Sequence, residues 1–580
     1  MSAPTRPPDR AAPTAPGAHP RRRRLARARL APLGVAAFAA FAAGVAVGAQ
    51  ADDARRTAAQ AFVRAWARGD YAAMHALVTP EARNRIALRR FARTYRSAAK
   101  VATLSSIDPG RAEDPRDGAV VVPVVLRTRV FGALARRLAL PVVESDDGAR
   151  IAWAPHLVVP GLRPGEKLSR STQMPPRAAI QARDGTPLAR GEARTSELGT
   201  IASDVAGTIG PAPPELASAL ARRGVPRETP VGLSGLEREF DTELAGRPGG
   251  ELRGDAQVLA KVAPQPGRAV RTTIDPEVQT AAVAALAGRF GGVAVLRPDD
   301  GEVLALAGIA YSAPQPPGSV FKIVTLAGAL EAGVVRKRSS YPVQTAAVLE
   351  GVELENANGE SCGGSLRNSF AHSCNSVFAP MGAKLGAPRL VAAAEAFGFN
   401  EDPGLDGALP STIPPAEEIG DDLAVGSSAI GQGRLLATPL QIAELAAAIA
   451  ADGVRARPTL RKSAPPRRTR ATPVAVARTV GSFMRSVVTD GTGGGAAVPG
   501  IAVAGKTGTA ELRDTTVDVV DPESEVPPVD DVTDTTAWFA AYAPARRPRV
   551  AVSVMLVGQG AGGATAAPAA RVVLEAALGR

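Results

Sequence analysis

The chain has 580 residues, which is several times what one hydrophobic core accommodates, so we expect about three or four folded units. Hydrophobic residues make up 45% of the sequence and charged residues 21%, a composition that excludes a wholly disordered protein. The net charge of +12 does not indicate a nucleic-acid partner, because residues 1–29 alone carry +7 and aromatic residues make up only 4% of the sequence.

An uncharged stretch, LAPLGVAAFAAFAAGVAVGA at 30–49, follows the basic tail of residues 1–29. Its length is about what a helix needs to cross a bilayer, and the arginines before it favour a cytoplasmic N-terminus. We therefore expect a single transmembrane anchor at 30–50, with the remaining chain outside the cytoplasm at the cell membrane. A cleavable signal peptide is the alternative, because the small residues in AQA at 49–51 suit a cleavage site.

Residues 52–160 predict a small α+β domain. Apolar side chains recur at helical spacing from Ala58 to Leu77, and Gly69-Asp70 divides this stretch into two helices. Three β-branched segments bounded by Gly, Asp and Pro then predict an antiparallel sheet: GAVVVPVVLRTRVF, LALPVVES and ARIAWAPHLVV.

Residues 165–270 alternate short β-type runs with Gly, Pro and charged turns, and they predict an extended β-rich module. Residues 271–580 predict a long α/β region. Its expected helices begin at Asp275-Pro276 and Ser319 and cover 366–385, 438–453 and 566–578. Its expected strands lie at 291–307, 501–511, 536–544 and 549–558.

The stretch PPGSVFKIVT at 316–325 places Ser319 and Lys322 three residues apart at the start of a predicted helix. Side chains at this spacing share a helix face, so a Lys amine can reach a Ser hydroxyl. A Lys whose pKa is lowered by burial and nearby cations can act as the base that activates such a hydroxyl. The pattern alone is weak, because Ser is an ordinary helix cap and Lys an ordinary surface residue.

Two further motifs strengthen the argument. A hydroxyl and an amide occur in SCN, and a cation with two hydroxyls and a glycine occurs in KTGT on a predicted strand. The motifs follow one another as Ser319-x-x-Lys322, Ser373-x-Asn375 and Lys506-Thr507-Gly508-Thr509. In order and spacing they resemble the penicilloyl serine transferases, which comprise the penicillin-binding DD-transpeptidases and the serine β-lactamases.

The resemblance extends over nearly all of the chain after the anchor. Four stretches are similar to the transpeptidase domain of penicillin-binding proteins: TIDPEVQ, IGQGRLLATPLQIA, GKTGTAE and AWFAAYAP. RAAIQARDGTPLA and VGLSGLEREFDTELAG are similar to the dimerisation or linker module of class B enzymes, with Ala178 where the family usually has Gly. Residues 54–160 resemble the NTF2-like domain of penicillin-binding protein 2a and its relatives.

The resemblance implies a multidomain α/β protein. Its expected parts are the anchor, an NTF2-like domain at 52–160, a dimerisation module at 165–270 and a transpeptidase domain at 271–580. The last would have the penicillin-binding or β-lactamase-like fold, in which an antiparallel sheet is flanked by helices and joined by an all-helical subdomain.

The resemblance also implies a role for each motif residue. Ser319 would attack a D-alanyl-D-alanine stem peptide, with Lys322 as base, Ser373 as proton relay and Asn375 as the group that orients Lys322. Lys506, Thr507 and Thr509, with Gly508 between them, would bind the terminal carboxylate, and the backbone N–H groups of Ser319 and Thr509 would form the oxyanion hole. An amine from a neighbouring peptidoglycan strand would then form the cross-link, and β-lactams would stay bound as esters.

Two other functions remain open at this stage. A membrane-tethered β-lactamase or DD-carboxypeptidase would use the same motifs to hydrolyse its substrate. A catalytically idle scaffold in a division or elongation complex would not use them. No cofactor is expected, and the four His and two Cys show no metal-ligand spacing.

Several remaining features are given structural interpretations. Cys362 and Cys374 of an exported chain can form a disulfide, and two separate buried thiols are the alternative. GQGAGG at 558–563 fits a dinucleotide motif, but the chain ends too soon for its acidic residue. His372 is expected to pack or to lie on the surface, Trp538 and Phe539 to lie in the core, and the acidic stretch 514–534 to be solvated, with a flap beside the cleft as the alternative.

Overall fold

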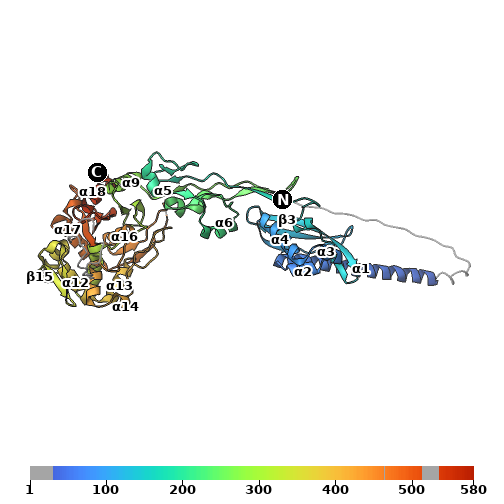
Figure 1. Ribbon diagram of the computed structural model, residues 1–580, viewed down its shortest axis with the longest axis horizontal. Coiled ribbons are helices and arrows are strands. Elements are labelled where there is room, and N and C mark those ends of the chain that lie inside the picture. Colours follow the sequence, from blue (N-terminus) through green and yellow to red (C-terminus); the bar gives the residue numbers. More distant parts are fainter. Residues whose placement is uncertain (1–30, 463, 512–534) are drawn as a thin grey trace, which may run out of the picture. The chain divides into compact units, whose positions relative to one another are not determined.

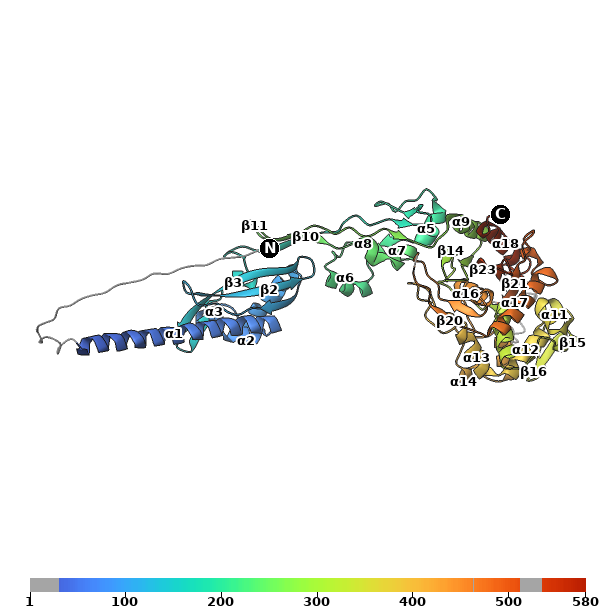
Figure 2. The same cartoon turned by 180° about the vertical axis from the view of Figure 1, so that it is seen from behind.

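The computed structural model describes residues 31–462, 464–511 and 535–580, except for the side chains of 31–48 and Asn358. The basic tail 1–29 and the acidic stretch 514–534 lie outside the described residues. The chain divides into two compact units, one formed by 1–170 with 252–260 and the other by 171–251 with 261–580. Figure 1 and Figure 2 show them from opposite sides.

The predicted anchor falls almost entirely on residues whose side chains are not described. The backbone from Ala31 to Arg68 forms one helix, α1. Within the part of the chain that the structure describes, no helix is both long enough and apolar enough to cross a bilayer. The anchor at 30–50 therefore stays a prediction.

The first unit packs helices against a four-stranded sheet. After α1 come α2 (Tyr71–Ala76), α3 (Pro80–Arg85) and α4 (Leu88–Val101). The strands are β1 (Leu104–Pro109), β2 (Ala119–Thr128), β3 (Gly132–Ser145) and β4 (Gly148–Ile151), paired antiparallel in that order.

The expected break between the first two helices is confirmed. Gly69 has φ 70°, which ends α1, and the Asp70 carboxylate caps α2 by accepting the Ala73 N–H at 2.9 Å. The predicted antiparallel sheet is also present. Along β2 more and less buried residues alternate, because one face of the sheet packs against the helices around Phe62, Phe91 and Tyr95.

The middle of the chain contains the expected short strands. β5 (Leu168–Gln173), β10 (Gly249–Gly254) and β11 (Gln257–Val262) form one sheet, and β6 (Ile180–Gln181), β7 (Pro187–Ala189) and β12 (Val270–Arg271) form another. The sequence analysis missed the short helices between these strands. They are α5 (Thr200–Ala206), α6 (Ala217–Arg223), α7 (Gly235–Glu239) and α8 (Asp241–Ala245).

A five-stranded antiparallel sheet forms the centre of the C-terminal region. Its order is β14-β13-β23-β22-β21. The strands are β13 (Gly291–Leu296), β14 (Val303–Gly308), β21 (Ala504–Glu511), β22 (Thr535–Ala543) and β23 (Val550–Leu556). The stretch 291–307, expected as one strand, is a hairpin, because residues 297–302 form the turn between β13 and β14. β21 lies at the edge of the sheet and carries the KTGT motif.

Both faces of this sheet are buried. On one face Val295, Phe539 and Val554 pack against α9 (Pro276–Leu286) and α18 (Ala566–Ala577), which lie side by side in both views (Figure 1, Figure 2). On the other face Trp538 and Tyr542 pack against two more helices, α16 (Pro439–Ala450) and α17 (Val474–Thr489). Trp538 and Phe539 are fully buried, as predicted.

Further helices continue the core on the α16 and α17 side. They are α10 (Lys322–Glu331), α11 (Leu366–Ala371), α12 (Asn375–Leu385), α13 (Ala387–Ala396), α14 (Ala416–Ile419) and α15 (Asp422–Ala429). Paired short strands lie among them: β15 (Ser340–Gln344) with β18 (Cys362–Ser365), β16 (Ala346–Leu349) with β17 (Val352–Glu355), and β19 (Val454–Ala456) with β20 (Arg468–Arg470).

The single helix expected at 366–385 is wrong. The chain forms α11 and α12 instead, because Ser373 between them has φ 61°, in the left-handed region that a continuous helix cannot contain. This break places Ser373 and Cys374 between the two helices and Asn375 at the first position of α12.

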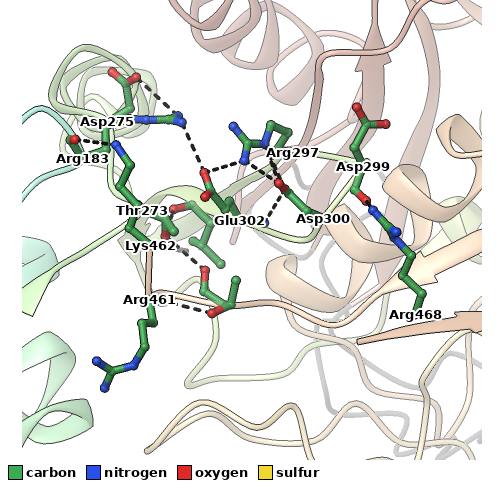
Figure 3. A network of polar contacts seen from close by, with 12 residues as sticks. Arg183, Thr273, Asp275, Arg297, Asp299, Asp300, Glu302, Arg461, Lys462 and Arg468 are labelled. Atoms are coloured by element: carbon green, nitrogen blue, oxygen red, sulfur yellow. Dashed lines mark hydrogen bonds and ion pairs between the residues drawn. The ribbon is translucent and has the colours of Figure 1, made fainter. Parts of the chain in front are cut away.

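A charged network ties the middle module to the C-terminal sheet (Figure 3). Glu302, 8% exposed, accepts hydrogen bonds or ion pairs from Arg183 at 3.2 Å and Arg297 at 2.9 Å. Lys462 Nζ donates to the Arg183 carbonyl at 2.9 Å. Because the carboxylate is buried between two guanidinium groups, these contacts hold the module against the domain.

Candidate active site

Ser319 lies in a 3₁₀ turn, Gly318–Phe321, which leads directly into α10. The helix expected to begin at Ser319 thus begins as a tighter turn. The Lys322 N–H donates to the Ser319 carbonyl, and residues three apart in a 3₁₀ turn are eclipsed. Positions 319 and 322 therefore lie on the same side of the turn.

Close backbone contacts hold this turn in place. The Gly318 N–H donates to the Gly431 carbonyl at 2.9 Å, and the Trp538 indole N–H donates to the Pro316 carbonyl at 2.9 Å. Gly318 has φ 53°, and a Cβ built there would lie 2.4 Å from the Thr509 carbonyl oxygen. Only glycine fits, so the Ser319 turn packs directly against the edge strand β21.

Lys322 is fully buried and surrounded by oxygen acceptors. Its Nζ donates to the Ser373 carbonyl at 2.7 Å and to Asn375 Oδ1 at 2.6 Å, and lies 3.3 Å from Ser373 Oγ. Burial, with a smaller contribution from the charge of Lys506, lowers the pKa of Lys322 well below its usual value. When the Lys322 amine is neutral, it can donate its two N–H groups to these oxygens, and the lone pair of its nitrogen can still accept a proton.

The second motif, Ser373-Cys374-Asn375, spans the junction between α11 and α12. Its middle residue, Cys374, forms a disulfide with Cys362 on β18, which resolves the two alternatives for these cysteines. Asn375 Nδ2 donates to the Glu355 carbonyl at 2.7 Å, so the amide oxygen is the atom that faces Lys322. The disulfide and this hydrogen bond orient the motif from both sides.

Lys506 on β21 is the second fully buried lysine. Its Nζ donates to Ser373 Oγ at 2.8 Å and to the Thr507 carbonyl at 3.0 Å. Burial lowers the pKa of Lys506 to about 7. Because both lysines contact one hydroxyl, Ser373 connects two amines whose protonation is coupled.

Unlike Lys506, the remaining residues of the KTGT motif contact parts of the protein outside the SCN motif. The Thr507 hydroxyl faces Thr492, with the two oxygens 2.5 Å apart, and so is engaged within the protein. Thr509, half buried, accepts the Gly562 N–H at 3.3 Å. Gly508 packs under Pro317, whose carbonyl oxygen would lie 2.8 Å from an added Cβ.

The structure thus links Lys322, Ser373, Asn375 and Lys506 by direct side-chain contacts. Ser319 and Thr509 are brought together through the Gly318 turn. The sequence analysis missed supporting roles for Trp538, Gly431, Gly562 and Thr492. A signal was present for Gly562, because the glycine-rich stretch 558–563 marks a close backbone approach: an added Cβ would lie 2.2 Å from the Gly508 carbonyl oxygen.

His372 is exposed. Within the described residues, no group of three or more His, Cys, Asp or Glu side chains could hold a metal ion. The groups that this geometry brings together are a hydroxyl, two buried amines, an amide and the backbone of an edge strand.

Comparisons with protein families match three parts of the chain. Residues 291–575 match the penicillin binding protein transpeptidase domain. Residues 54–166 match the NTF2-like N-terminal transpeptidase domain, and 184–271 match the penicillin-binding protein dimerisation domain.

Individual relatives agree. The chain is 33% identical over 383 residues to the peptidoglycan D,D-transpeptidase PbpA of Mycolicibacterium smegmatis, covering 54% of this chain and 73% of that protein. It is 37% identical over 300 residues to PbpA of Mycobacterium tuberculosis, covering 46% of this chain and 56% of that protein.

Solved structures give the same result. The penicillin G acyl-enzyme complex of penicillin-binding protein A from M. tuberculosis has a TM-score of 0.55 and 30% identity, covering 70% of this chain and 99% of that one. The D,D-transpeptidase domain from Eggerthella lenta has a TM-score of 0.56 and 29% identity, covering 70% and 98%. The chain belongs to the class B penicillin-binding proteins and carries an NTF2-like domain before its dimerisation and transpeptidase domains.

Proposed function

We propose that this protein is a peptidoglycan D,D-transpeptidase, a serine acyltransferase of cell-wall synthesis that binds penicillin covalently. The observation that carries the proposal is the contact of Lys322 and Lys506 with the same side chain, Ser373, beside the Ser319 turn. The family and the acyl-enzyme complexes of its relatives support the same activity.

The acylation step combines the roles that the family resemblance gives to the motif residues with the contacts of Lys322. Lys322, neutral because its pKa is lowered, takes the proton of the Ser319 hydroxyl, and the oxygen bonds to the carbonyl carbon of the D-alanyl-D-alanine peptide. The amide C–N bond then breaks. Ser373 passes a proton to the leaving amine of the terminal D-Ala, and Asn375 keeps Lys322 aimed at the reacting oxygen.

Substrate would be held along β21. An edge strand has backbone N–H and C=O groups that its own sheet does not use, so an extended stem peptide can lie beside it. The backbone N–H groups of Ser319 and Thr509 would receive the carbonyl oxygen as negative charge develops. Lys506 and the threonines Thr507 and Thr509 would bind the terminal carboxylate.

Deacylation completes the reaction. The amine of a neighbouring stem peptide attacks the ester carbon, a new amide forms, and the Ser319 oxygen leaves and regains its proton. The amine of a β-lactam stays attached to the acyl group after the ring opens, so its ester would block this second step.

The sequence suggests two further partners: a cell membrane that holds the anchor at 30–50, and proteins of a division or elongation complex.

Labelling with a fluorescent penicillin tests the proposal. The wild type and the control Ser312→Ala should retain label for hours, whereas Ser319→Ala should retain none. Ser312 is a suitable control because it is exposed and lies in the loop just before the turn. Rapid release of the label would favour a β-lactamase or carboxypeptidase, and no labelling of the wild type would favour an idle scaffold.

A further inference from the structure

A cavity of about 560 Å³ opens in the NTF2-like domain. Its lining residues come from the start of α2 and from α4, and none belongs to the transpeptidase domain. The volume lies within the range of small-molecule sites. The residues that give this cavity its chemistry are Tyr71, Leu88, Arg89, Arg93 and Arg96.

Three arginines gather on one side of the cavity. Arg89, Arg93 and Arg96 stand at i, i+4 and i+7, on one face of α4, and all three are exposed. Among the described residues none of the three has a carboxylate partner. Other arginines of the same domain do have one: Arg55 pairs with Glu144, Arg56 with Asp114, Arg127 with Asp108 and Arg137 with Glu113.

The arrangement is unfavourable for the helix itself. Like charges at i, i+3 and i, i+4 repel, and α4 contains no acidic residue to offset them. Asp70 is the one acidic residue among the described residues that line the cavity, and its carboxylate is occupied as the cap of α2, 2.9 Å from the Ala73 N–H. Because three arginines face this single carboxylate, the lining of the cavity carries a net positive charge.

The remaining walls are aromatic and apolar. The guanidinium carbon of Arg96 lies 5.2 Å from the centre of the Tyr71 ring, a cation–π contact that restrains this side chain. Leu88, 41% exposed, supplies an apolar surface. The cavity thus combines an anion-binding wall with a surface against which a ring or an alkyl group can pack.

We propose that this cavity binds a phosphate-bearing ligand, either a soluble sugar phosphate or the headgroup of an anionic lipid. A guanidinium group can donate two parallel N–H hydrogen bonds to the oxygens of a phosphate. Three guanidinium groups offer more donors than the two oxygens of a single carboxylate can accept. The site does not depend on the transpeptidase activity, and its loss leaves Ser319 untouched.

Calorimetric titration of the full-length protein in neutral detergent with inorganic pyrophosphate tests the site. We expect saturable binding of one equivalent to the wild type. Arg93→Ala and Arg89→Ala should each lower the affinity at least tenfold, whereas Arg90→Ala should lower it less than twofold. Arg90 is the matched control because it is an exposed arginine of α4 that does not line the cavity.

The outcomes are distinct. Absence of saturable binding, or an equal loss in Arg90→Ala and Arg93→Ala, would overturn the proposal, because only the general charge of α4 would then matter. Unchanged penicillin labelling and thermal unfolding of each variant check that it is folded. Competition experiments identify the source of the ligand. If glucose 1-phosphate displaces pyrophosphate at the lower concentration, the ligand is a sugar phosphate. If glycerol 3-phosphate does so, the ligand is a lipid headgroup. Displacement of pyrophosphate by sodium chloride at the same ionic strength would overturn the proposal for either ligand source.

Discussion

Lys506 Nζ lies 2.8 Å from Ser373 Oγ, and this hydrogen bond joins the edge strand β21 to the segment between α11 and α12. The same hydroxyl oxygen lies 3.3 Å from Lys322 Nζ. Ser373 is therefore the connection through which a proton can pass between two fully buried amines. Removal of this single oxygen breaks the side-chain connection between the two lysines, while Lys322 keeps its hydrogen bonds to the Ser373 carbonyl and to Asn375.

We expect Ser373→Ala to slow acylation by a β-lactam about 10²- to 10³-fold, because the proton relay is lost while Ser319 and its base remain. The second-order rate constant for labelling by a fluorescent penicillin measures this change. Ser312→Ala, in an exposed loop, should leave the rate constant unchanged. A Ser373→Ala rate within twofold of the wild type would show that the proton travels by another route.

The decrease of the acylation rate constant at low pH should follow the protonation of Lys322. Burial and the nearby charge of Lys506 lower its pKa, so the amine is neutral at pH values where an ordinary lysine is charged. As the pH falls through this lowered pKa, Lys322 gains a proton and can no longer act as base, and acylation should slow. Lys322→Arg should abolish labelling at every pH, because a guanidinium does not lose its proton.

The alkaline side should depend on the ligand. Free Lys506, with its pKa lowered to about 7, is neutral above that pH. A bound carboxylate favours the charged form and raises this pKa, so acylation by a penicillin should persist above pH 7. The rate constant from pH 5 to 10 checks both limbs. If the decrease of the rate constant at low pH has the same midpoint in the wild type, Ser373→Ala and Lys506→Gln, the protonation of the two lysines is not coupled.

The sequence predicted which motif residues come together better than it predicted their local backbone. Lys322, Ser373 and Lys506 lie in contact, as the resemblance of the three motifs to one family implied. The left-handed turn at Ser373 could not be predicted, because the apolar spacing over 366–385 fits one helix and the break depends on tertiary contacts and the disulfide.

Trp538 illustrates the same limit. An apolar strand predicts a buried indole, and the side chain is indeed fully buried. Its second role, the hydrogen bond to the Pro316 carbonyl that supports the Ser319 turn, joins positions 222 residues apart and leaves no local signal. Likewise, the short helices of the middle module span only five to seven residues each, too few for a helical period to stand out.

The disulfide should support both stability and activity. Cys374 sits between Ser373 and Asn375, and its bond to Cys362 closes a loop with a sequence separation of 12. A loop of this size contributes on the order of 3 kcal/mol to the free energy of unfolding. We expect the Cys362→Ser/Cys374→Ser double variant to unfold at a lower denaturant concentration and to be acylated more slowly.

Dithiothreitol supplies the control. It should lower the unfolding midpoint and the labelling rate of the wild type toward those of the double variant, and it should leave the double variant unchanged. Equal acylation rates with and without the disulfide would show that the contacts of Asn375 with Glu355 and Lys322 hold it in place without the bond.

Glu444 on α16 is a buried carboxyl group outside the site. It is 4% exposed, and its Oε1 lies 3.6 Å from Arg455 Nε, too far for a hydrogen bond, while Arg455 also contacts Glu401 more closely. Burial, with a contribution from Glu401, raises the pKa of Glu444 to about 8 against the attraction of Arg455. Because Glu444 Oε1 lacks a hydrogen-bond donor among the described residues, we take the carboxyl group to be neutral at pH 7.

The expected consequence is a loss of stability as the pH rises. In the unfolded chain Glu444 ionises near its ordinary pKa of 4.5, whereas in the folded protein it keeps its proton up to about pH 8. Between these values the folded state binds more protons, so this group lowers the free energy of unfolding by about 1.4 kcal/mol for each pH unit gained. Glu444→Gln does not titrate, so its stability relative to the wild type should increase steadily from pH 5 to pH 8. Urea unfolding at each pH measures the difference, with the exposed Glu277→Gln as the control that should follow the wild type. Parallel curves for Glu444→Gln and the wild type would mean that Arg455 keeps Glu444 ionised in the folded protein.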